Sequence, residues 1–297
     1  MANVYEIVTE KVLEALAAGV VPWRRPWASN GQDMPSSLRT GKSYRGINVW
    51  LLLASAMAHG YRSNKWLTYD YALELGGNVR RGEHGTLIVF WKFDDRQQDE
   101  DGGDEGEDGA RGSRCIMRYY RVFNTEQCDG LPASTEPVIT APASQFTPIA
   151  QAAAVIEGMP KRPEIQHGGD RAYYVPVMDR VSLPNPEQFT DPQHYYNVAF
   201  HELGHSTGHT SRLARKEVGM AGVAFASHAY SREELVAEFC AAFLCAHVGI
   251  ESQTLADSAA YIDHWSRALR ADSKLVVGAA QAAQKAADFI LNQTPAS

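Results

Sequence analysis

The sequence predicts an α+β protein of two domains, and three observations support this fold class. In the first 130 residues, two segments rich in β-branched and aromatic residues follow three helix candidates. Residues 131–149 are rich in Pro, Ser, Thr and Ala without periodicity, which is typical of a linker. After this linker, helix candidates follow a short layer of strands. A chain of 297 residues, 44% of them hydrophobic, is long enough to build two cores.

The first domain, residues 1–130, is expected to combine three helices with two long strands. Its glycine-rich acidic segment at 94–112 lacks apolar residues before Ala110 and predicts a disordered insertion between the strands. Residues 93–109 hold one basic residue against nine acidic ones, whereas residues 1–92 hold 11 Lys and Arg against 7 Asp and Glu, a net charge of +4. The helices are expected at 3–18, 47–59 and 68–75, and the strands at 85–93 and 114–124.

The second domain, residues 150–297, is expected to place four helices beside a small sheet. The segment RAYYVPVMDRVSLP carries the strand signals, and such an edge strand is able to hold an extended peptide by strand addition. The helices are expected at 148–157, around the segment NVAFHELGHS, at 231–249 and at 274–292, and the strands near 171–176 and 179–183.

Composition argues against membrane and secreted classes. No run of eighteen apolar residues is present, and the N-terminal segment is an amphipathic, acid-containing helix candidate without a cleavage pattern. The four cysteines form no C-x-x-C pair, and Cys240 and Cys245 fall in an apolar helix, where reduced core residues are expected. These features predict a cytoplasmic protein that makes no membrane contact.

The segment HELGH at 201–205 predicts a catalytic metal site. On a helix, His201 and His205 are one turn apart and point to the same side, so both rings can bind one ion. Zinc in catalytic sites takes three protein ligands and one water, and Glu202 would be the general base that takes a proton from that water. Gly204 is small at a point where such a helix must pack closely. The alternative is a helix with two surface histidines and a solvated acid. Another divalent metal would fit the same donors.

The third ligand is expected from a later helix. Metzincins would require a histidine where Ser211 stands, and His209 lies about 12 Å along the helix axis from His201, so we treat His209 as a residue that supports the ligands or faces the substrate. The segment from Ser231 instead offers Glu233, Glu234 and Glu238.

Two interpretations of these glutamates compete. Glu234 and Glu238 form E-x-x-A-E, which resembles the E-x-x-A-D of some gluzincins, in which the first acid binds zinc and the second braces a ligand histidine. In the alternative, all three acids are a solvated first turn favoured by the helix dipole. We expect Glu234 to be the third ligand and Glu238 to brace a ligand histidine.

Aromatic and basic residues alternate along the first domain, a composition typical of proteins that bind single-stranded nucleic acid. Bases stack on aromatic rings at about 1–3 kcal/mol each while cations contact phosphates. The alternative is that the tryptophans belong to the core. The candidate DNA-binding residues are Trp23, Arg24, Arg25, Trp27, Lys42, Tyr44, Arg45, Lys65, Trp66, Arg80 and Arg81.

Several of these segments together resemble one family. The segments GVVPWRRPW, GKSYRGINVWLL, WLTYDYALELGGNVRRGEHGT, YYRVFNTEQ, HELGHSTGHTSRL and EELVAEF are similar to the ArdC-type antirestriction proteins of conjugative plasmids, whose N-terminal domain is shared with TraC-type plasmid primases. The resemblance implies a single-stranded-DNA-binding domain joined to a zincin-like metallopeptidase domain. It also implies a protein that protects incoming plasmid DNA during conjugation, in the cytoplasm or after transfer to the recipient cell.

Two functional classes follow from these observations. In the first, the protein shields single-stranded DNA and its zinc site is structural or vestigial. In the second, it is a zinc metalloprotease that cleaves a host or plasmid protein, and DNA binding serves to target it. The complete HELGH motif favours retained chemistry, because a structural zinc site does not need Glu202.

Overall fold

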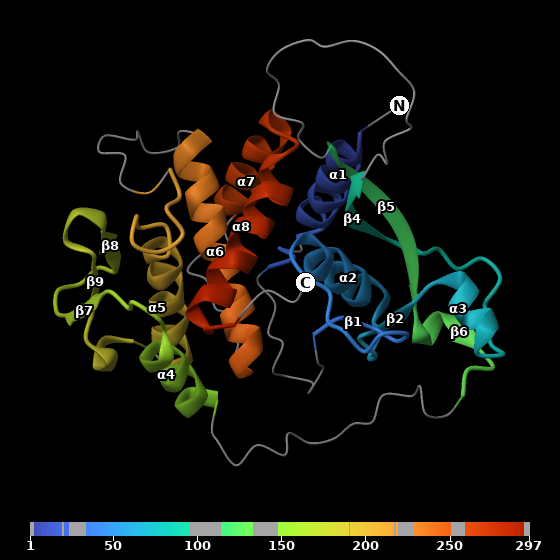
Figure 1. Cartoon of the computed structure of the whole chain (residues 1–297), viewed down its shortest axis with the longest axis horizontal. Coiled ribbons are helices and arrows are strands. Elements are labelled where there is room, and N and C mark those ends of the chain that lie inside the picture. Colours follow the sequence, from blue (N-terminus) through green and yellow to red (C-terminus); the bar gives the residue numbers. More distant parts are fainter. Residues whose placement is uncertain are drawn as a thin grey trace, which may run out of the picture.

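The fold is described from a computed structural model of the chain (Figure 1). The structure describes residues 3–19, 21–23, 34–94, 114–132, 148–189, 191–216, 218, 228–250 and 259–293. We refer to residues 3–132 as the N-terminal half and to residues 148–293 as the C-terminal half.

The N-terminal half packs three helices beside a four-stranded sheet. In this sheet the strand order is β1-β2-β5-β4, and the long β4–β5 pair is antiparallel throughout. A second, two-stranded antiparallel sheet pairs β3 with β6. The helices are α1 (Val4–Ala17), α2 (Ile47–His59) and α3 (Tyr69–Glu74), and the strands are β1 (Ser36–Ser37), β2 (Lys65–Leu67), β3 (Asn78–Val79), β4 (Thr86–Asp94), β5 (Arg114–Asn124) and β6 (Cys128–Asp129).

The C-terminal half consists of five helices with a three-stranded sheet at its outer side (Figure 1). This sheet has the order β7-β9-β8, with β7 parallel and β8 antiparallel to the central β9, so β8 is an edge strand. The helices are α4 (Pro148–Gly158), α5 (Pro192–Ser206), α6 (His228–Val248), α7 (Ala259–Ala271) and α8 (Leu275–Ile290), and the strands are β7 (Glu164–His167), β8 (Tyr173–Val175) and β9 (Arg180–Leu183).

Most elements lie where the sequence predicts them. The helix expected at 47–59 begins and ends at those residues, and left-handed Gly60 ends it, as glycine commonly does. The sequence did not predict helix α7 or the short strands β1, β2, β3, β6 and β7, each of four residues or fewer. The predicted boundaries of the two domains stay predictions, and residues 95–112 of the acidic insertion and 133–147 of the linker lie outside the described residues.

The two halves share one hydrophobic core. Trp23 lies edge-on to Phe239 of α6, with ring centroids 5.0 Å apart, and Trp50 of α2 stacks on Phe243 at 4.7 Å. Helix α8 lies between α6 and the N-terminal half (Figure 1), and its apolar face belongs to the same core cluster. Residues of the N-terminal half therefore complete the packing around α6, and the two halves are not separated by solvent.

The buried tryptophans correct part of the predicted DNA-binding set. Trp23 is 1% exposed and Trp66 is 0% exposed, so neither ring offers a face on which a base can stack. The physical reason is that burying an indole stabilises the fold through its large apolar area. The alternative considered for these residues, that they belong to the core, is the correct one. Among the described helices, none is both long and apolar enough to cross a bilayer.

Candidate metal centre

Helix α5 carries the HELGH motif and is fixed at both ends by side-chain caps. The Asp191 side chain accepts a hydrogen bond from the His194 backbone N–H at 2.9 Å, and Pro192 occupies the first turn, where a missing N–H costs nothing. At the other end, the Thr207 hydroxyl donates to the Gly204 carbonyl at 2.7 Å. The buried face presents Phe200 and Leu203 to the core, which leaves the two motif histidines on the side facing α6.

Gly204 allows α5 to approach α6 closely. A Cβ atom at this position would lie 3.2 Å from the Cα of Ala237 and 3.3 Å from the Cβ of Cys240, closer than ordinary contact. The prediction that α5 needs a small residue at this position is therefore confirmed. The close approach matters because α6 carries the acidic residues of the site.

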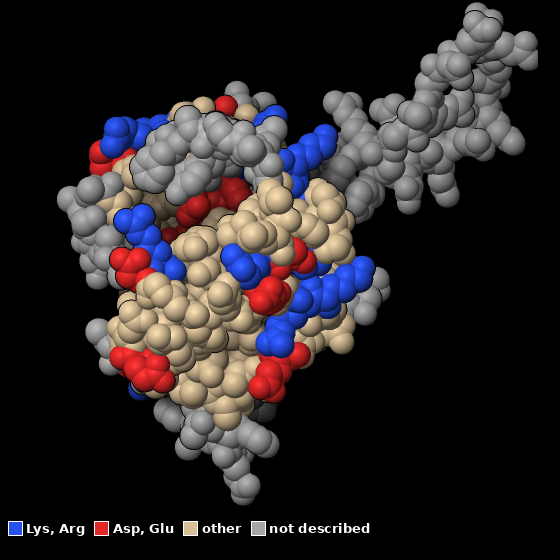
Figure 2. Space-filling view, turned by 90° about the vertical axis from the view of Figure 1, so that its left-hand side faces the viewer, with Lys and Arg blue, Asp and Glu red and all other residues tan. Residues whose placement is uncertain are grey.

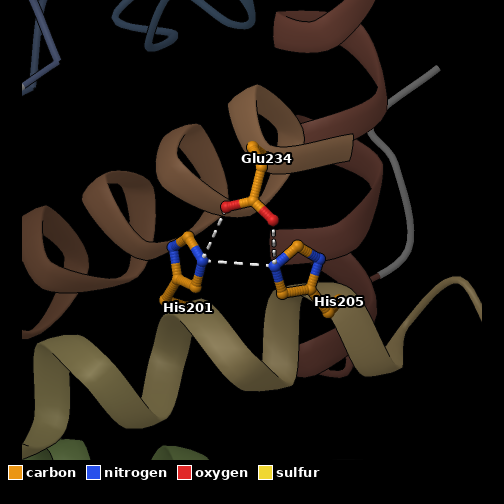
Figure 3. Close-up of side chains that lie close together, drawn as sticks. All are labelled: His201, His205 and Glu234. Atoms are coloured by element: carbon orange, nitrogen blue, oxygen red, sulfur yellow. Dashed lines mark hydrogen bonds and ion pairs between the residues drawn. The ribbon is translucent and has the colours of Figure 1, made fainter. Parts of the chain in front are cut away.

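The structure brings His201, His205 and Glu234 together (Figure 3). The two Nε2 atoms are 3.2 Å apart, and each lies 3.5 Å from one Glu234 carboxylate oxygen. Ligands placed about 2.1 Å from a tetrahedral zinc ion are about 3.4 Å from one another. Each of the distances above is close to that spacing, although the two histidines contact different oxygens of Glu234. Two imidazoles and a carboxylate are also the donor types that zinc and similar divalent ions bind.

A buried ion pair holds His205 in orientation from the side opposite the cluster. The His205 Nδ1–H donates to Glu233 at 3.3 Å, and Arg215 binds both oxygens of the same carboxylate, at 2.6 Å and 3.0 Å. Arg215 also donates to the Gly204 carbonyl and to the Thr207 hydroxyl, which ties it to the end of α5. With Nδ1 protonated, the lone pair of His205 Nε2 faces Glu234 and His201, as a metal ligand requires.

Glu233 supports one of the two histidines, a role that the sequence did not predict. It contacts His205 because it lies one residue before Glu234 and faces the C-terminal end of α5. The bracing role expected of Glu238 stays a prediction. Burial raises the pKa of Glu233, but its hydrogen bonds with His205 and Arg215 outweigh this and lower it. Glu238 acts on His201 through its charge.

The site has a strongly negative local field. Burial lowers the pKa of His201, but its hydrogen bond with Glu234 and the charges of Glu202, Glu238 and Glu234 outweigh burial and raise the pKa to about 9. The carboxylates that hold a proton on His201 would equally favour a divalent cation at this point. Glu202, which follows His201 directly, is buried, as expected for a base inside the site.

His209 lies beyond the end of α5, not one turn further along it, because the helix ends at Ser206. Its Nδ1 is 2.8 Å from the Ser211 hydroxyl and 3.9 Å from the Asp179 carboxylate. Asp179 also pairs with Arg212, whose fully buried side chain donates to the Ser206 carbonyl at 2.7 Å. His209 therefore belongs to a cluster that ties the β8–β9 connection to the end of α5.

The outer face of the C-terminal half is mostly uncharged. Figure 2 shows basic and acidic side chains interspersed on this face, with acidic side chains visible inside a hollow. Among the residues coloured there, the basic side chains form no continuous track of the kind that a nucleic acid backbone requires.

The remaining DNA-binding candidates have different surroundings. Lys42 and Arg81 are exposed, Tyr44 and Lys65 are partly buried, and Arg45 pairs with Asp288 of α8. Arg80 is exposed but bonds to Glu83 and to the Glu126 carbonyl, so part of its hydrogen-bonding capacity serves the fold. Arg24, Arg25 and Trp27 lie outside the described residues.

Sequence reasoning missed the residues that support the site. Arg215 stands in an irregular segment with no local signal, because its partners are 8 to 18 positions away in the chain.

The missed helix α7 does carry a sequence signal, since the apolar residues Tyr261, Trp265 and Leu269 repeat every four residues. Three exposed aromatic residues were also missed, because sequence does not distinguish them from core residues. They are Phe90, Tyr119 and Tyr120 of the β4–β5 pair.

Comparisons with known proteins match both halves. A model of the N-terminal domain of the anti-restriction factor ArdC matches residues 2–123, and a model of zincin-like metallopeptidases matches residues 151–282. Protein y4eC of Sinorhizobium fredii (strain NBRC 101917 / NGR234) is 37% identical over 292 residues, which cover 97% of this chain and 91% of that protein. A DNA primase TraC of Escherichia coli is 37% identical over 300 residues, which cover 97% of this chain but 27% of the primase.

Two solved structures are similar along almost the whole chain. They are the metal-free and Mn(II)-bound crystal structures of the antirestriction ArdC protein from plasmid R388. Both have a TM-score of 0.76 and 34% sequence identity. The alignments cover 99% and 98% of this chain, and 100% and 98% of the respective crystal chains.

Proposed function

Because the chain belongs to the ArdC-type antirestriction family, we propose that it binds single-stranded DNA and protects incoming plasmid DNA from restriction during conjugation. The same chain carries a divalent-metal centre formed by His201, His205 and Glu234, with zinc as the first candidate and manganese, which a related crystal structure contains, as the second.

The observation that carries DNA binding is a group of exposed aromatic residues on the β4–β5 pair. Phe90 and Tyr120 are each close to half exposed, although large aromatic side chains are normally buried. Exposed Arg118 lies opposite Phe90 in the strand register, on the same face of the pair. Aromatic faces beside cations are the combination that binds unpaired bases and their phosphates.

DNA binding is tested with the full-length protein, because Trp23 and Trp50 of the N-terminal half pack on α6 and a fragment would expose that core. Fluorescence anisotropy compares a labelled single strand of about 20 nucleotides with the same sequence as a duplex, at several salt concentrations. We expect tighter binding of the single strand, and an affinity that falls as salt rises. Equal or tighter binding of the duplex would overturn the proposal.

Protection is tested in conjugation. Plasmid transfer into recipients with and without an active restriction system is compared, with the protein present or deleted. We expect the deletion to lower transfer only into restricting recipients, because recipients without a restriction system do not cleave the incoming DNA. An equal effect in both recipients would assign the protein to transfer itself and refute a role against restriction.

A second candidate function is peptide hydrolysis, and the position of Glu202 favours it. A divalent ion held by His201, His205 and Glu234 would supply a coordinated water of lowered pKa. Glu202, which follows His201 in the chain and whose charge acts on it, would accept the proton of that water. Edge strand β8, with half-exposed Tyr173, has the free backbone edge that an extended peptide would pair with.

The variant Glu202→Gln separates these functions. It removes the base without removing a proposed metal ligand, so metal content should stay at the wild-type level while any peptide cleavage is lost. The measurement is cleavage of a proteome-derived peptide library by metal-loaded protein. Wild-type protein that cleaves nothing in that library would argue against peptidase activity and leave the DNA-protecting function as the proposal.

A further inference from the structure

A cavity of about 930 Å³ lies between the two halves, and its lining includes none of the three proposed metal ligands. Its walls come mainly from three places in the chain: the segment that leads into α2, the β4–β5 pair, and α8. The floor is apolar, formed in part by buried Ile88 and Val122. Figure 1 shows α8 between α6 and the N-terminal half, and residues of α8 form one wall of the cavity.

One wall of this cavity is aromatic. The rings of Phe90 and Tyr120 are 5.7 Å apart and inclined at 68°, and both residues are about half exposed. They line the cavity together because Ile88 pairs with Tyr120 and Phe90 lies two residues further along the same strand face. Tyr119 is equally exposed but does not line the cavity, since neighbouring residues of a strand point to opposite faces.

The rim of the cavity is basic. Lys42 and Arg45 come from the segment before α2, and Lys285 comes from α8. The single acid among the lining residues, Asp288, is 6% exposed at its side chain, pairs with Arg45 and accepts a hydrogen bond from Gln284 at 3.1 Å. The charge of Asp288 is thereby offset, and Lys42 and Lys285 leave the cavity with an excess of positive charge.

We propose that this cavity binds one nucleotide of a single-stranded DNA chain, with its base against Phe90 and Tyr120 and its phosphates beside Lys42 and Lys285. The inference rests on the proposed DNA binding and extends it, because it makes α8 a wall of the DNA site. An aromatic wall alone would suit many apolar ligands, but basic residues around it select an anion. A base in a duplex is stacked between its neighbours and cannot place its face against these rings, so the site discriminates against duplex DNA.

The position of α8 places the DNA site close in the fold to the proposed metal ligands. The apolar face of α8 packs against α6, the helix that carries Glu234. One helix therefore separates the nucleotide cavity from the acid of the metal centre. Both sites depend on the same packing of α6, α8 and the N-terminal half.

The test measures binding of the same labelled single strand to the full-length protein by fluorescence anisotropy. Tyr120→Ala is compared with its matched control Tyr119→Ala, which removes an equally exposed ring from the other face of β5. We expect Tyr120→Ala to weaken binding about tenfold and Tyr119→Ala less than about threefold, because one stacked base is lost only in the first. Thermal unfolding checks that both variants keep the fold.

The contribution of α8 is tested by charge. Lys285→Gln removes the exposed lysine that lines the cavity, and Lys274→Gln removes an exposed lysine at the other end of the same helix. The slope of log affinity against log salt concentration should become less negative by about 0.7 for Lys285→Gln. The slope should stay unchanged for Lys274→Gln. Thymidine 5′-monophosphate should displace the labelled strand only at millimolar concentration, because a single nucleotide lacks the contacts that the rest of the strand makes with the protein.

The outcomes separate this inference from the proposed function. Wild-type protein that fails to bind the single strand refutes both. Wild-type binding that Tyr120→Ala and Lys285→Gln leave unchanged, or that Tyr119→Ala weakens as strongly as Tyr120→Ala, refutes the cavity as the site while DNA binding stands. Displacement by the mononucleotide at micromolar concentration would show a free-nucleotide site and also overturn the inference.

Discussion

Replacing Glu233 with glutamine should weaken metal binding about 10- to 100-fold while the protein stays folded. In the structure the Glu233 carboxylate accepts from the His205 Nδ1–H and from two nitrogens of Arg215. Glutamine has the same shape but places an NH₂ group where one of these acceptors was, so it faces a donor. Alanine is avoided, because it would leave Arg215 buried without its carboxylate, at a cost of about 3–5 kcal/mol.

The expected magnitude follows from the bonds that change. A hydrogen bond to a charged group contributes about 1.5–3 kcal/mol, and the substitution removes the charge and at least one such bond. Part of that loss appears as reorientation of His205, whose Nε2 lies 3.2 Å from His201 Nε2 and 3.5 Å from Glu234. At about 1.4 kcal/mol for each factor of ten, this corresponds to the range of about 10- to 100-fold.

The assay is competition with a chromophoric chelator, carried out with zinc and with manganese at neutral pH. Glu164→Gln, which changes an exposed glutamate of β7, is the matched control and should bind metal like the wild type. Arg215→Lys keeps the positive charge but loses the bidentate contact with Glu233, so its metal affinity should lie between those of the wild type and Glu233→Gln. A folded Glu233→Gln protein with wild-type affinity for both metals would refute the argument that Glu233 orients His205.

Three further predictions concern the same part of the molecule. Zinc at about 100 times its dissociation constant should stabilise the wild type by about 2.7 kcal/mol and so raise its melting temperature. Glu234→Ala should abolish this rise. An unchanged rise would assign the third ligand to another acid. Gly204→Ala should destabilise the fold by about 1–2 kcal/mol in urea unfolding because its Cβ would crowd α6, whereas Gly158→Ala, with no atom within 4 Å, should be neutral or stabilising. For Asp179, burial raises the pKa, but hydrogen bonds from Arg212 and Tyr174 outweigh it and lower the pKa. Its contribution to stability is therefore present above the unfolded pKa of about 3.9 and lost as pH falls through the lower folded value, so Asp179→Asn should reduce the slope of stability against pH in that range.

The chemistry of the motif histidines could be predicted from sequence because it depends on local geometry. Residues four apart on a helix face the same way whatever the helix packs against, so the spacing alone pairs His201 with His205. The same holds for the long elements, whose periodicity predicts helices such as α2 and strands such as β4. The approach of Glu234 is expected from the E-x-x-A-E segment on the next strong helix, and its position beside both rings agrees with that expectation.

The burial of aromatic residues could not be predicted in this way. Trp23 and Trp66 stand in basic segments that suggest exposure, whereas Phe90 and Tyr120 stand in strands that suggest a core. Whether an aromatic ring is buried depends on what other elements lie over its face, and that information is spread over distant parts of the chain. The DNA-contacting role that we propose for the β4–β5 pair comes only from its exposed face.

The sequence by itself determined most of the longer elements, the α+β class and the HELGH motif with its two histidines and its glutamate, because each of these depends on residues within a few positions of one another. The tertiary structure alone decided which acid supports which histidine, that Arg215 fastens Glu233 to the end of α5, and that α8 joins the two halves in one core. These features depend on which faces of distant elements meet. Burial of apolar area drives that choice, and it is a property of the whole chain and not of any local segment.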